Sequence, residues 1–362
     1  RVARPWYRRR SQRDRAAQVV TCAGAAVKAD SVARRMMALL SLLAGVATGL
    51  ADSDSDFWTN RRQLIIGGNQ ASSFEHTHQV AISTKPKLQE STFHCGGSLL
   101  AADVVLTAAH CFKDALHCFS DDGGDALVWD RTVSPGSSCH LAWADYHVGV
   151  HRYELGHPDA HNEHPECSDT IRVERVTIHN YYDDYTEEND VALLHLAHSA
   201  PCVVDGKSGK SDLITLPSRN AKKAEWDNQF AVATGWGDRD EQPSSARGKE
   251  FDFPSALHEL TLKVLNLKDC RAKYKQAGPD WLVSSVMICA QSPDARMRDT
   301  ALGDSGGPLV LMRYNEPPLQ IGIVSWGVST HDYPAVFTRV SRFVEWIEAH
   351  AGVRPPSPPP IS

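Results

Sequence analysis

Short runs of apolar and β-branched residues recur along the chain from about residue 79 onward, separated by polar and glycine-rich segments. The clearest runs are residues 79–83, 171–178 and 320–325, and the second of these alternates apolar and polar side chains most regularly. Runs of this length and composition are typical of β-strands. No repeat with a period of about 20 to 50 residues is visible, so the pattern predicts an all-β domain and not a solenoid.

A helical period appears near the carboxyl terminus. Phe343, Val344 and Ile347 fall on one face of residues 341–350, which predicts a helix. The proline-rich tail at 352–362 follows, and we interpret it as a disordered end in preference to a docking ligand.

The amino-terminal region is interpreted as processing segments. Residues 38–51 form an apolar run too short to span a membrane comfortably, which predicts a signal peptide over 36–51, cut after Ala51. Residues 52–64 then lie between this cleavage site and the folded domain. Residues 1–35 begin with Arg1 and are rich in arginine. We interpret them as a gene-model extension or part of a fragment, and the alternatives are a basic tail or a nucleic-acid-binding segment.

Charge and length limit the class of partner. The whole chain has a net charge of −6, and residues 36–362 carry 28 Lys/Arg and 42 Asp/Glu, a net charge of −14. An acidic body of this kind argues against nucleic acid as a partner. The chain after residue 65 is long enough to bury a large core, and a single folded domain is expected there.

Cysteine usage predicts an oxidising compartment. Of the nine cysteines only Cys22 precedes residue 65, which leaves an even number in the domain. An even number is expected for a disulfide-bonded protein that is secreted to the extracellular space.

Ser305 lies in the glycine-rich segment GDSGGP, six positions after Asp299. A serine hydroxyl is a weak nucleophile at neutral pH, so it needs a general base and a group that orients the base. His110, in TAAHC, and Asp190, in NDVALL, are the candidates. Taken singly, a serine in a turn or a buried histidine is usually structural, so the interpretation depends on the three occurring together in the order His, Asp, Ser. That order differs from those of subtilisin and the α/β-hydrolases.

These segments, with ATGWG at 233–237 and IVSWG at 323–327, resemble the trypsin/chymotrypsin family of serine endopeptidases over about residues 65–351. The resemblance implies an all-β fold of two packed six-stranded antiparallel β-barrels with a C-terminal helix. It also implies hydrolysis of peptide bonds through an acyl-enzyme, a route that needs no cofactor.

The resemblance assigns catalytic roles to single residues. Ser305 attacks the substrate carbonyl, His110 takes the serine proton and later protonates the leaving amine, and Asp190 orients the imidazole and stabilises its positive charge. The backbone N–H groups of Gly303 and Ser305 form the oxyanion hole.

The same resemblance assigns substrate binding to Asp299, Ser325, Trp326, Gly327 and Ala335. Asp299 predicts Arg or Lys before the scissile bond, by charge pairing at the floor of the specificity pocket. Ser325 also supports Asp190, and the edge from Ser325 to Gly327 pairs with the substrate backbone. Ala335 replaces a usual glycine and the disulfide that usually braces the pocket is missing, so a narrowed or relaxed pocket is the alternative.

Activation is expected to involve Ile65 and Asp304. The segment IIGG at 65–68 resembles the family's mature amino terminus, whose freed amine pairs with the aspartate before the nucleophile. The resemblance therefore implies that the chain is made as a zymogen, with residues 52–64 as its activation propeptide. Leu64 precedes Ile65, and the basic pair Arg61-Arg62 ends two residues earlier. We therefore expect either direct cleavage after Leu64 or a tryptic cut followed by trimming. Protein or peptide substrates, an activating protease and protein inhibitors are the expected partners.

The resemblance also implies two disulfides, Cys95 with Cys111 and Cys270 with Cys289. The other four cysteines of the domain allow three pairings, and we favour Cys118 with Cys139 only because they are close together; the four are Cys118, Cys139, Cys167 and Cys202.

No metal is predicted. Residues 156–167 gather three histidines and a cysteine with spacing that suits zinc or copper, but a hydrophilic surface loop is the preferred interpretation. Calcium is not expected either, because Val150 stands where related trypsins have their first glutamate ligand.

A second hypothesis is a catalytically inactive homologue that binds a protein partner through the intact cleft. Such homologues commonly lose a member of the triad, whereas this chain retains all three. In neither case is a membrane span expected in the mature protein.

Overall fold

The computed structural model describes residues 68–73, 75–112, 132–133, 146–156, 165–203, 212–221, 225–238, 253–278, 282–293, 300–301, 303–314, 316–327 and 333–352. All of these belong to the unit Arg62–Ser362. The predicted leader, signal peptide and propeptide lie outside the described residues, as does the tail from residue 353, so their boundaries stay predictions.

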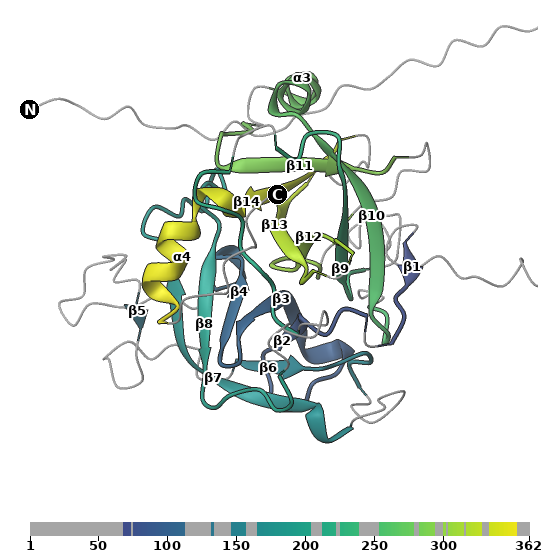
Figure 1. The fold of residues 1–362 in the computed structure, drawn as a ribbon, viewed down its shortest axis with the longest axis vertical. Coiled ribbons are helices and arrows are strands. Elements are labelled where there is room, and N and C mark those ends of the chain that lie inside the picture. Colours follow the sequence, from purple (N-terminus) through teal and green to yellow (C-terminus); the bar gives the residue numbers. More distant parts are fainter. Residues whose placement is uncertain are drawn as a thin grey trace, which may run out of the picture. The chain divides into compact units, whose positions relative to one another are not determined.

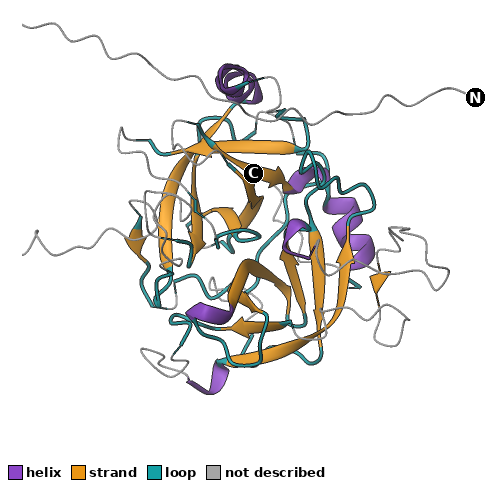
Figure 2. Ribbon diagram, turned by 180° about the vertical axis from the view of Figure 1, so that it is seen from behind, coloured by secondary structure: helices purple, strands orange, loops and turns teal. Residues whose placement is uncertain are grey.

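The strands alternate with short turns through most of this unit. The strands are β1 (Asn69–Gln70), β2 (Gln79–Ser83), β3 (Phe93–Ala101), β4 (Val104–Thr107), β5 (Thr132–Val133), β6 (His147–Val150), β7 (Asp169–Ile178), β8 (Ala192–Leu196), β9 (Phe230–Gly235), β10 (His258–Leu265), β11 (Met287–Gln291), β12 (Pro308–Leu311), β13 (Leu319–Trp326) and β14 (Ala335–Arg339). The described α-helices are α3 (Leu267–Ala277) and α4 (Val344–His350), and Glu90–Thr92, Pro165–Cys167 and Val340–Arg342 are 3-10 turns. Figure 2 shows how strongly strands predominate over helices.

The first barrel closes in the order β7-β6-β2-β3-β4-β8, with β8 pairing back to β7. It is drawn in blue to teal in Figure 1. The two-residue strand β5 adds to the edge of β7. Apolar side chains fill the interior, among them Leu99, Leu106 and Ile171, which are fully buried. The run at 79–83 coincides with β2 and the run at 171–178 lies within β7, so both strand predictions are confirmed.

The second barrel closes in the order β10-β11-β14-β13-β12-β9, with β9 pairing back to β10, and β1 adds to its edge. Leu262, Ile321 and Phe337 are fully buried in its core. The predicted strand at 320–325 lies within β13. The prediction of two six-stranded antiparallel barrels is therefore confirmed, with one extra short strand on each.

The closing helix is present but begins later than predicted. Val340–Arg342 forms a 3-10 turn, and Phe343 (φ −117°, ψ 2°) departs from helical geometry, so α4 starts only at Val344. Phe343, Val344 and Ile347 are buried and join the core of the first barrel. In Figure 1 α4 follows the last strand of the second barrel and lies beside β8. The carboxyl-terminal segment thus packs the two barrels together.

Helix α3 was not predicted. Asn266 caps it by accepting a hydrogen bond from Asp269 N at 2.9 Å. Asparagine at such a position is a recognised start signal for a helix, and the pattern was present in the sequence. Cys270 in α3 is bonded to Cys289 in β11, which fastens the helix to the second barrel.

The described disulfides join Cys95 to Cys111, Cys167 to Cys202 and Cys270 to Cys289. The bond from Cys167 to Cys202 decides a pairing that the sequence left open. Cys118 and Cys139 lie outside the described residues. None of the helices in the described ranges combines the length and the hydrophobicity needed to cross a bilayer.

Candidate active site

Strand register brings His110 and Asp190 together. β4 pairs antiparallel with β8, and Thr107 at the end of β4 lies opposite Ala192 at the start of β8. His110 follows Thr107 by three residues and Asp190 precedes Ala192 by two, so both leave the first barrel at the same end. The sequence could predict each residue, but only the pairing of β4 with β8 shows why they meet.

Asp190 is fully buried, and both of its carboxylate oxygens and its backbone carbonyl accept hydrogen bonds. Its Oδ2 lies 2.8 Å from His110 Nδ1, and its Oδ1 accepts from the backbone N of His110 at 2.9 Å. Ser325 Oγ donates to Oδ2 at 2.5 Å, and Thr338 Oγ1 donates to the Asp190 carbonyl at 2.7 Å. This arrangement fixes the imidazole ring with Nδ1 toward the carboxylate and leaves Nε2 on the opposite edge.

The environment keeps Asp190 ionised. Burial by itself raises the pKa of Asp190, but the nearby charge of His110 and the hydrogen bonds from His110 and Ser325 lower it more, and the resulting pKa lies below its ordinary value of 3.8. A buried carboxylate that stays charged can stabilise an imidazolium in the transition state.

The turn that carries Ser305 is held by backbone hydrogen bonds. Gly96 N donates to the Ser305 carbonyl at 2.8 Å, and Gly306 N donates to the Val324 carbonyl at 2.9 Å. Gly303 and Gly306 have φ values of +99° and +79°, which residues other than glycine rarely adopt. A Cβ on Gly306 would lie 2.2 Å from Thr107 Oγ1, so this turn packs against the segment that leads to His110.

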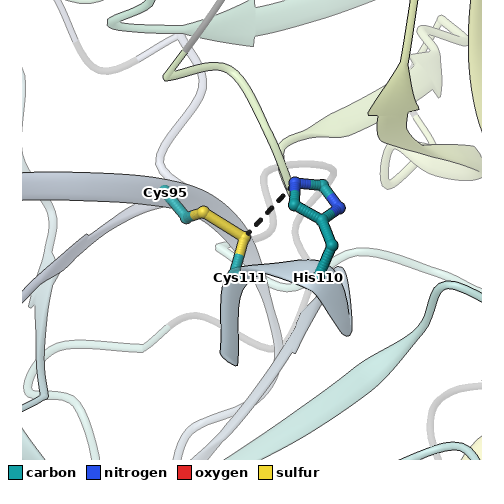
Figure 3. A group of neighbouring side chains, drawn as sticks. All are labelled: Cys95, His110 and Cys111. Atoms are coloured by element: carbon teal, nitrogen blue, oxygen red, sulfur yellow. Dashed lines mark hydrogen bonds between the residues drawn. A yellow bond between two sulfur atoms is a disulfide. The ribbon is translucent and has the colours of Figure 1, made fainter. Parts of the chain in front are cut away.

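A disulfide lies beside the imidazole (Figure 3). Cys111 Sγ is 4.0 Å from His110 Nε2, and Cys111 is bonded to Cys95 in β3. Because Cys95 precedes Gly96, the same short stretch of β3 contacts both the His110 loop and the Ser305 turn. The histidine side chain remains 17% exposed.

Asp304, next to Ser305, is buried between two backbone donors. Gly237 N donates to its Oδ1 at 2.9 Å and Ala301 N donates to its Oδ2 at 2.8 Å. Burial raises the pKa of Asp304 to about 6, against the opposing effect of these two hydrogen bonds. Ile65, its predicted partner after activation, lies outside the described residues.

The residues assigned to substrate binding are distributed along β13 and β14. Ser325 lies at a register shift between Val324 and Trp326, where β13 has one more residue than β14, and the bulge turns its hydroxyl toward Asp190. Gly327 is exposed, and Ala335 is buried in β14. Asp299 lies outside the described residues.

Sequence reasoning missed several neighbours of these residues. The ring of Trp326 lies 5.0 Å from that of Tyr274, which in turn lies 5.5 Å from that of Tyr333. Thr338 supports Asp190 from β14, and Glu187 offers a carboxylate oxygen within 4.8 Å of ligand atoms of His110 and Asp190. The sequence carries no local signal for these contacts, because each joins segments that are distant in the chain or depends on loop conformation.

The described residues contain groups with metal-ligating side chains, but these have other roles. His110 belongs to two of the groups, and its Nδ1 is already bonded to Asp190, while the sulfurs of Cys95 and Cys111 form a disulfide. The third group joins Glu75 to the pair of His76 and Glu259. The second ring nitrogen of His76, Nδ1, has no hydrogen-bond partner, whereas a metal-bound histidine almost always has one. We assign no metal. Residues 157–164 of the histidine-rich loop lie outside the described residues.

Comparison with known proteins places these features in context. A family model described as Trypsin matches residues 65–129 and 144–347. The chain is 31% identical over 284 residues to mast cell protease 3 of Ovis aries, covering 78% of this chain and 88% of that protein. It is 26% identical over 286 residues to trypsin Blo t 3 of Blomia tropicalis, covering 78% and 85%. It is 28% identical over 297 residues to tissue-type plasminogen activator of Bos taurus, covering 78% of this chain and only 44% of that protein.

Proposed function

The chain belongs to the trypsin family, and from that premise we propose that it is a serine endopeptidase that hydrolyses peptide bonds through an acyl-enzyme on Ser305. The observation that carries this proposal is the buried Asp190, which binds both the backbone and the ring of His110. The Ser305 turn packs against the same loop. A base held by a buried carboxylate, beside a turn that carries a serine, is the arrangement that nucleophilic catalysis by serine needs.

The proposed chemistry uses these residues as follows. His110 Nε2 accepts the proton of Ser305 Oγ as the oxygen attacks the peptide carbonyl, and Asp190 stabilises the imidazolium that forms. The backbone N–H groups of Gly303 and Ser305 would donate to the oxyanion of the tetrahedral intermediate. His110 then protonates the leaving amine. In the second half of the reaction His110 takes a proton from the water that attacks the acyl carbonyl and gives it to Ser305 Oγ as the acid product leaves.

Cleavage after Arg or Lys is the proposed specificity. It is supported by Asp299, six positions before Ser305, whose carboxylate would pair with a basic side chain. Ala335 in β14 is buried and is assigned to the wall of the specificity pocket, where its methyl group would leave less space for the substrate side chain than glycine does. Lys and Arg substrates therefore need to be compared directly.

Secretion and activation complete the proposal. The apolar run within 36–51 supports a signal peptide, and the described disulfides support an oxidising compartment. Cleavage before Ile65 would release an amine that pairs with the buried Asp304. The hydrogen bonds described for the Asp304 carboxylate come from two neutral backbone N–H groups. The propeptide 52–64 and the peptidase domain 65–351 are the proposed products.

The test is covalent labelling by a fluorophosphonate. The chain is expressed in an oxidising secretory host, processed to the Ile65 terminus, and compared with its Ser305→Ala variant. We expect labelling of the parent protein and none of the variant, together with hydrolysis of peptides that contain Arg or Lys. If the protein is folded and has a verified Ile65 terminus but is not labelled, the result would instead favour the inactive homologue that binds a protein partner.

A further inference from the structure

Three buried histidines lie where the segment that follows the predicted mature terminus meets both barrels. His76 and His78 precede β2 and His151 follows β6, and none of them is more than 7% exposed. The rings of His76 and His78 are in contact, with centroids 5.7 Å apart, and His76 and His151 line one small pocket with room for about one water molecule. The other lining residues are Thr77, Arg152, Tyr153 and Leu257. We call the three histidines the histidine junction.

Backbone hydrogen bonds tie this segment to both barrels. Ala71 N donates at 3.0 Å to the carbonyl of Leu257, which immediately precedes β10 of the second barrel. Leu99 N, in β3 of the first barrel, donates to the His78 carbonyl at 2.9 Å. Ile65 precedes β1 by only four residues. The position of this segment therefore limits how far the amine freed at Ile65 can reach.

The surroundings of these imidazole rings suit the neutral form. Within the described part of the chain, His76 Nδ1, His78 Nε2 and His151 Nε2 are buried without a hydrogen-bond partner. The other ring nitrogen of His76, Nε2, lies 2.7 Å from Glu259 Oε2. A neutral imidazole has one donor and one acceptor, whereas an imidazolium has two donors and a charge, and burying a charge without compensation is costly. Protonation of the junction is therefore opposed by its surroundings.

The charges that face the junction compensate an added proton only in part. Glu259 pairs with His76, and a carboxylate oxygen of the exposed Glu75 lies within 4.8 Å of ligand atoms of both. The charge that acts on His78 is that of His76, and it repels a second proton. His258 Nδ1, next to Glu259, donates to its neighbouring carbonyl at 2.7 Å. Other titratable groups of these segments are Arg152, Tyr153 and Glu154.

Burial lowers the pKa values of two of these histidines. Burial and, to a smaller extent, the charge of His76 lower the pKa of His78 to about 3. Burial also lowers the pKa of His151 below its ordinary value of 6.5, although the charge of Asp212 and a backbone hydrogen bond at Pro201 act against it. The unfolded segment therefore binds these protons more tightly than the folded segment does. The stabilisation that the neutral rings give is complete above about pH 6.5 and is lost as the pH falls toward 3.

We propose that the histidine junction is an acid-sensitive positioning device, which holds residues 69–79 in place at neutral pH and releases them reversibly in mildly acidic solution. His78 is the positioning residue that makes the release depend on pH. Because residues 69–79 connect β1 to β2, their release would also loosen the Ile65 terminus, whose proposed partner is Asp304. The release follows from the fold, whereas its effect on activity rests on the proposed function. Hydrolysis would thus be restricted to neutral surroundings.

Hydrogen exchange on the whole chain tests the release. The chain carries Ser305→Ala so that it cannot digest itself, and the protection of each segment is expressed relative to an unstructured peptide at the same pH. From about pH 7 to about pH 4.5 we expect the protection of residues 71–79 to fall by about 10- to 100-fold, because His78 gains its proton in the released segment. The protection of β13 should fall by a smaller factor. No decrease at residues 71–79, or an equal decrease in β13, overturns the proposal.

His78→Phe is the decisive variant, because phenylalanine keeps a ring against His76 and cannot be protonated. The decrease in protection at residues 71–79 should shrink to about threefold, the part left to His151. His78→Gln, which is neutral at every pH tested, is the second variant in case the apolar ring prevents folding. A folded His78 variant that keeps the full pH dependence overturns the proposal.

The matched control is His350→Gln. His350 lies in α4, outside the junction, and its Nδ1 donates to the Trp346 carbonyl at 2.7 Å. An amide N–H of glutamine can replace this donor, so the variant should keep the pH dependence of the parent. Loss of that dependence in His350→Gln would assign it to histidines in general and overturn the role of the junction.

Processed enzyme gives a second, independent reading. After a rapid return from about pH 4.5 to about pH 7, the parent should show a lag before full peptide hydrolysis while residues 69–79 repack, and His78→Phe should show a shorter one. Titration of His110 is immediate and common to both proteins, so it does not produce the difference. Equal lags would overturn the effect on activity. If the parent hydrolyses nothing at neutral pH, the proposed function fails, and the exchange result on Ser305→Ala still decides whether the junction opens.

Discussion

The two barrels contribute to the site in different ways. The first barrel supplies His110 and Asp190, and these are held mainly by contacts to side-chain atoms, above all those of the Asp190 carboxylate. The second barrel supplies Ser305, and its turn is held by bonds between backbone groups and by glycines that admit positive φ values.

This difference predicts different effects of substitutions in the two barrels. In the first barrel a single atom of Asp190 can be exchanged without changing the shape of the chain, so a substitution there is expected to remove activity and preserve the fold. In the second barrel the backbone itself supplies the proposed oxyanion donors and the two N–H groups that bind Asp304, so added volume is expected to disturb folding and activity together. The following predictions test that division.

Asp190→Asn should have the largest effect. The amide still fits the buried site, but its N–H group would face His110 Nδ1 and stabilise the wrong tautomer, and kcat is expected to fall by roughly 10⁴-fold. Peptide hydrolysis measures the rate and thermal unfolding measures the stability. Asp183→Asn is the control, because Oδ1 can still accept from Tyr185 N and Thr186 N in an exposed turn. Equal losses in the two variants would contradict the role of Asp190.

The buried charge of Asp304 should make the uncleaved chain less stable at neutral pH. Because the folded-state pKa of about 6 is above the ordinary value of 3.8, the folded state binds the proton more tightly than the unfolded state does. The stabilisation that the protonated Asp304 carboxyl gives the folded state is complete below about pH 4. It is lost as the pH rises through 6, which lowers the free energy of unfolding by about 3 kcal/mol.

Denaturant unfolding of the uncleaved chain and of Asp304→Asn between pH 4 and pH 7 measures this contribution. The stability of the parent relative to the variant should decrease across that range. After processing to Ile65 the decrease should be smaller, because the proposed ammonium partner favours the ionised carboxylate. A parent and a variant with parallel pH profiles in the uncleaved chain would refute the assignment.

Gly237→Ala should disturb the second barrel by steric overlap alone. An added Cβ would lie 2.4 Å from Asp304 Oδ2, whereas a Cβ on Gly156 would lie no closer than 3.8 Å to its nearest neighbour, Glu90. We expect Gly237→Ala to lower the free energy of unfolding by about 1 to 3 kcal/mol and to reduce activity as well. Gly156→Ala, measured by the same unfolding and hydrolysis assays, should change neither by much. A Gly237→Ala protein that is fully active and stable would show that the backbone around Asp304 is not tightly constrained.

Features of the sequence with a local signature were predictable, and those that depend on distant contacts were not. β-branched runs located β2, β7 and β13, and motifs identified the family and hence both barrels. Glu187 had no such signature, because its approach to His110 depends on a left-handed backbone and on the turn formed by Asp183. The disulfide from Cys167 to Cys202 likewise required the folded chain. The start of α4 was placed too early because hydrophobic spacing does not distinguish a 3-10 turn from the first turn of a helix.

The most direct test of the central claim is to locate the acyl group on the enzyme. Processed enzyme is mixed with an activated aryl ester, quenched in acid during the first turnover, digested and mapped by mass spectrometry. The account predicts one acyl group, on the peptide that contains Ser305, and none in Ser305→Ala. An acyl group on another residue, or rapid hydrolysis of the ester by both proteins with Ser305 never modified, would contradict it.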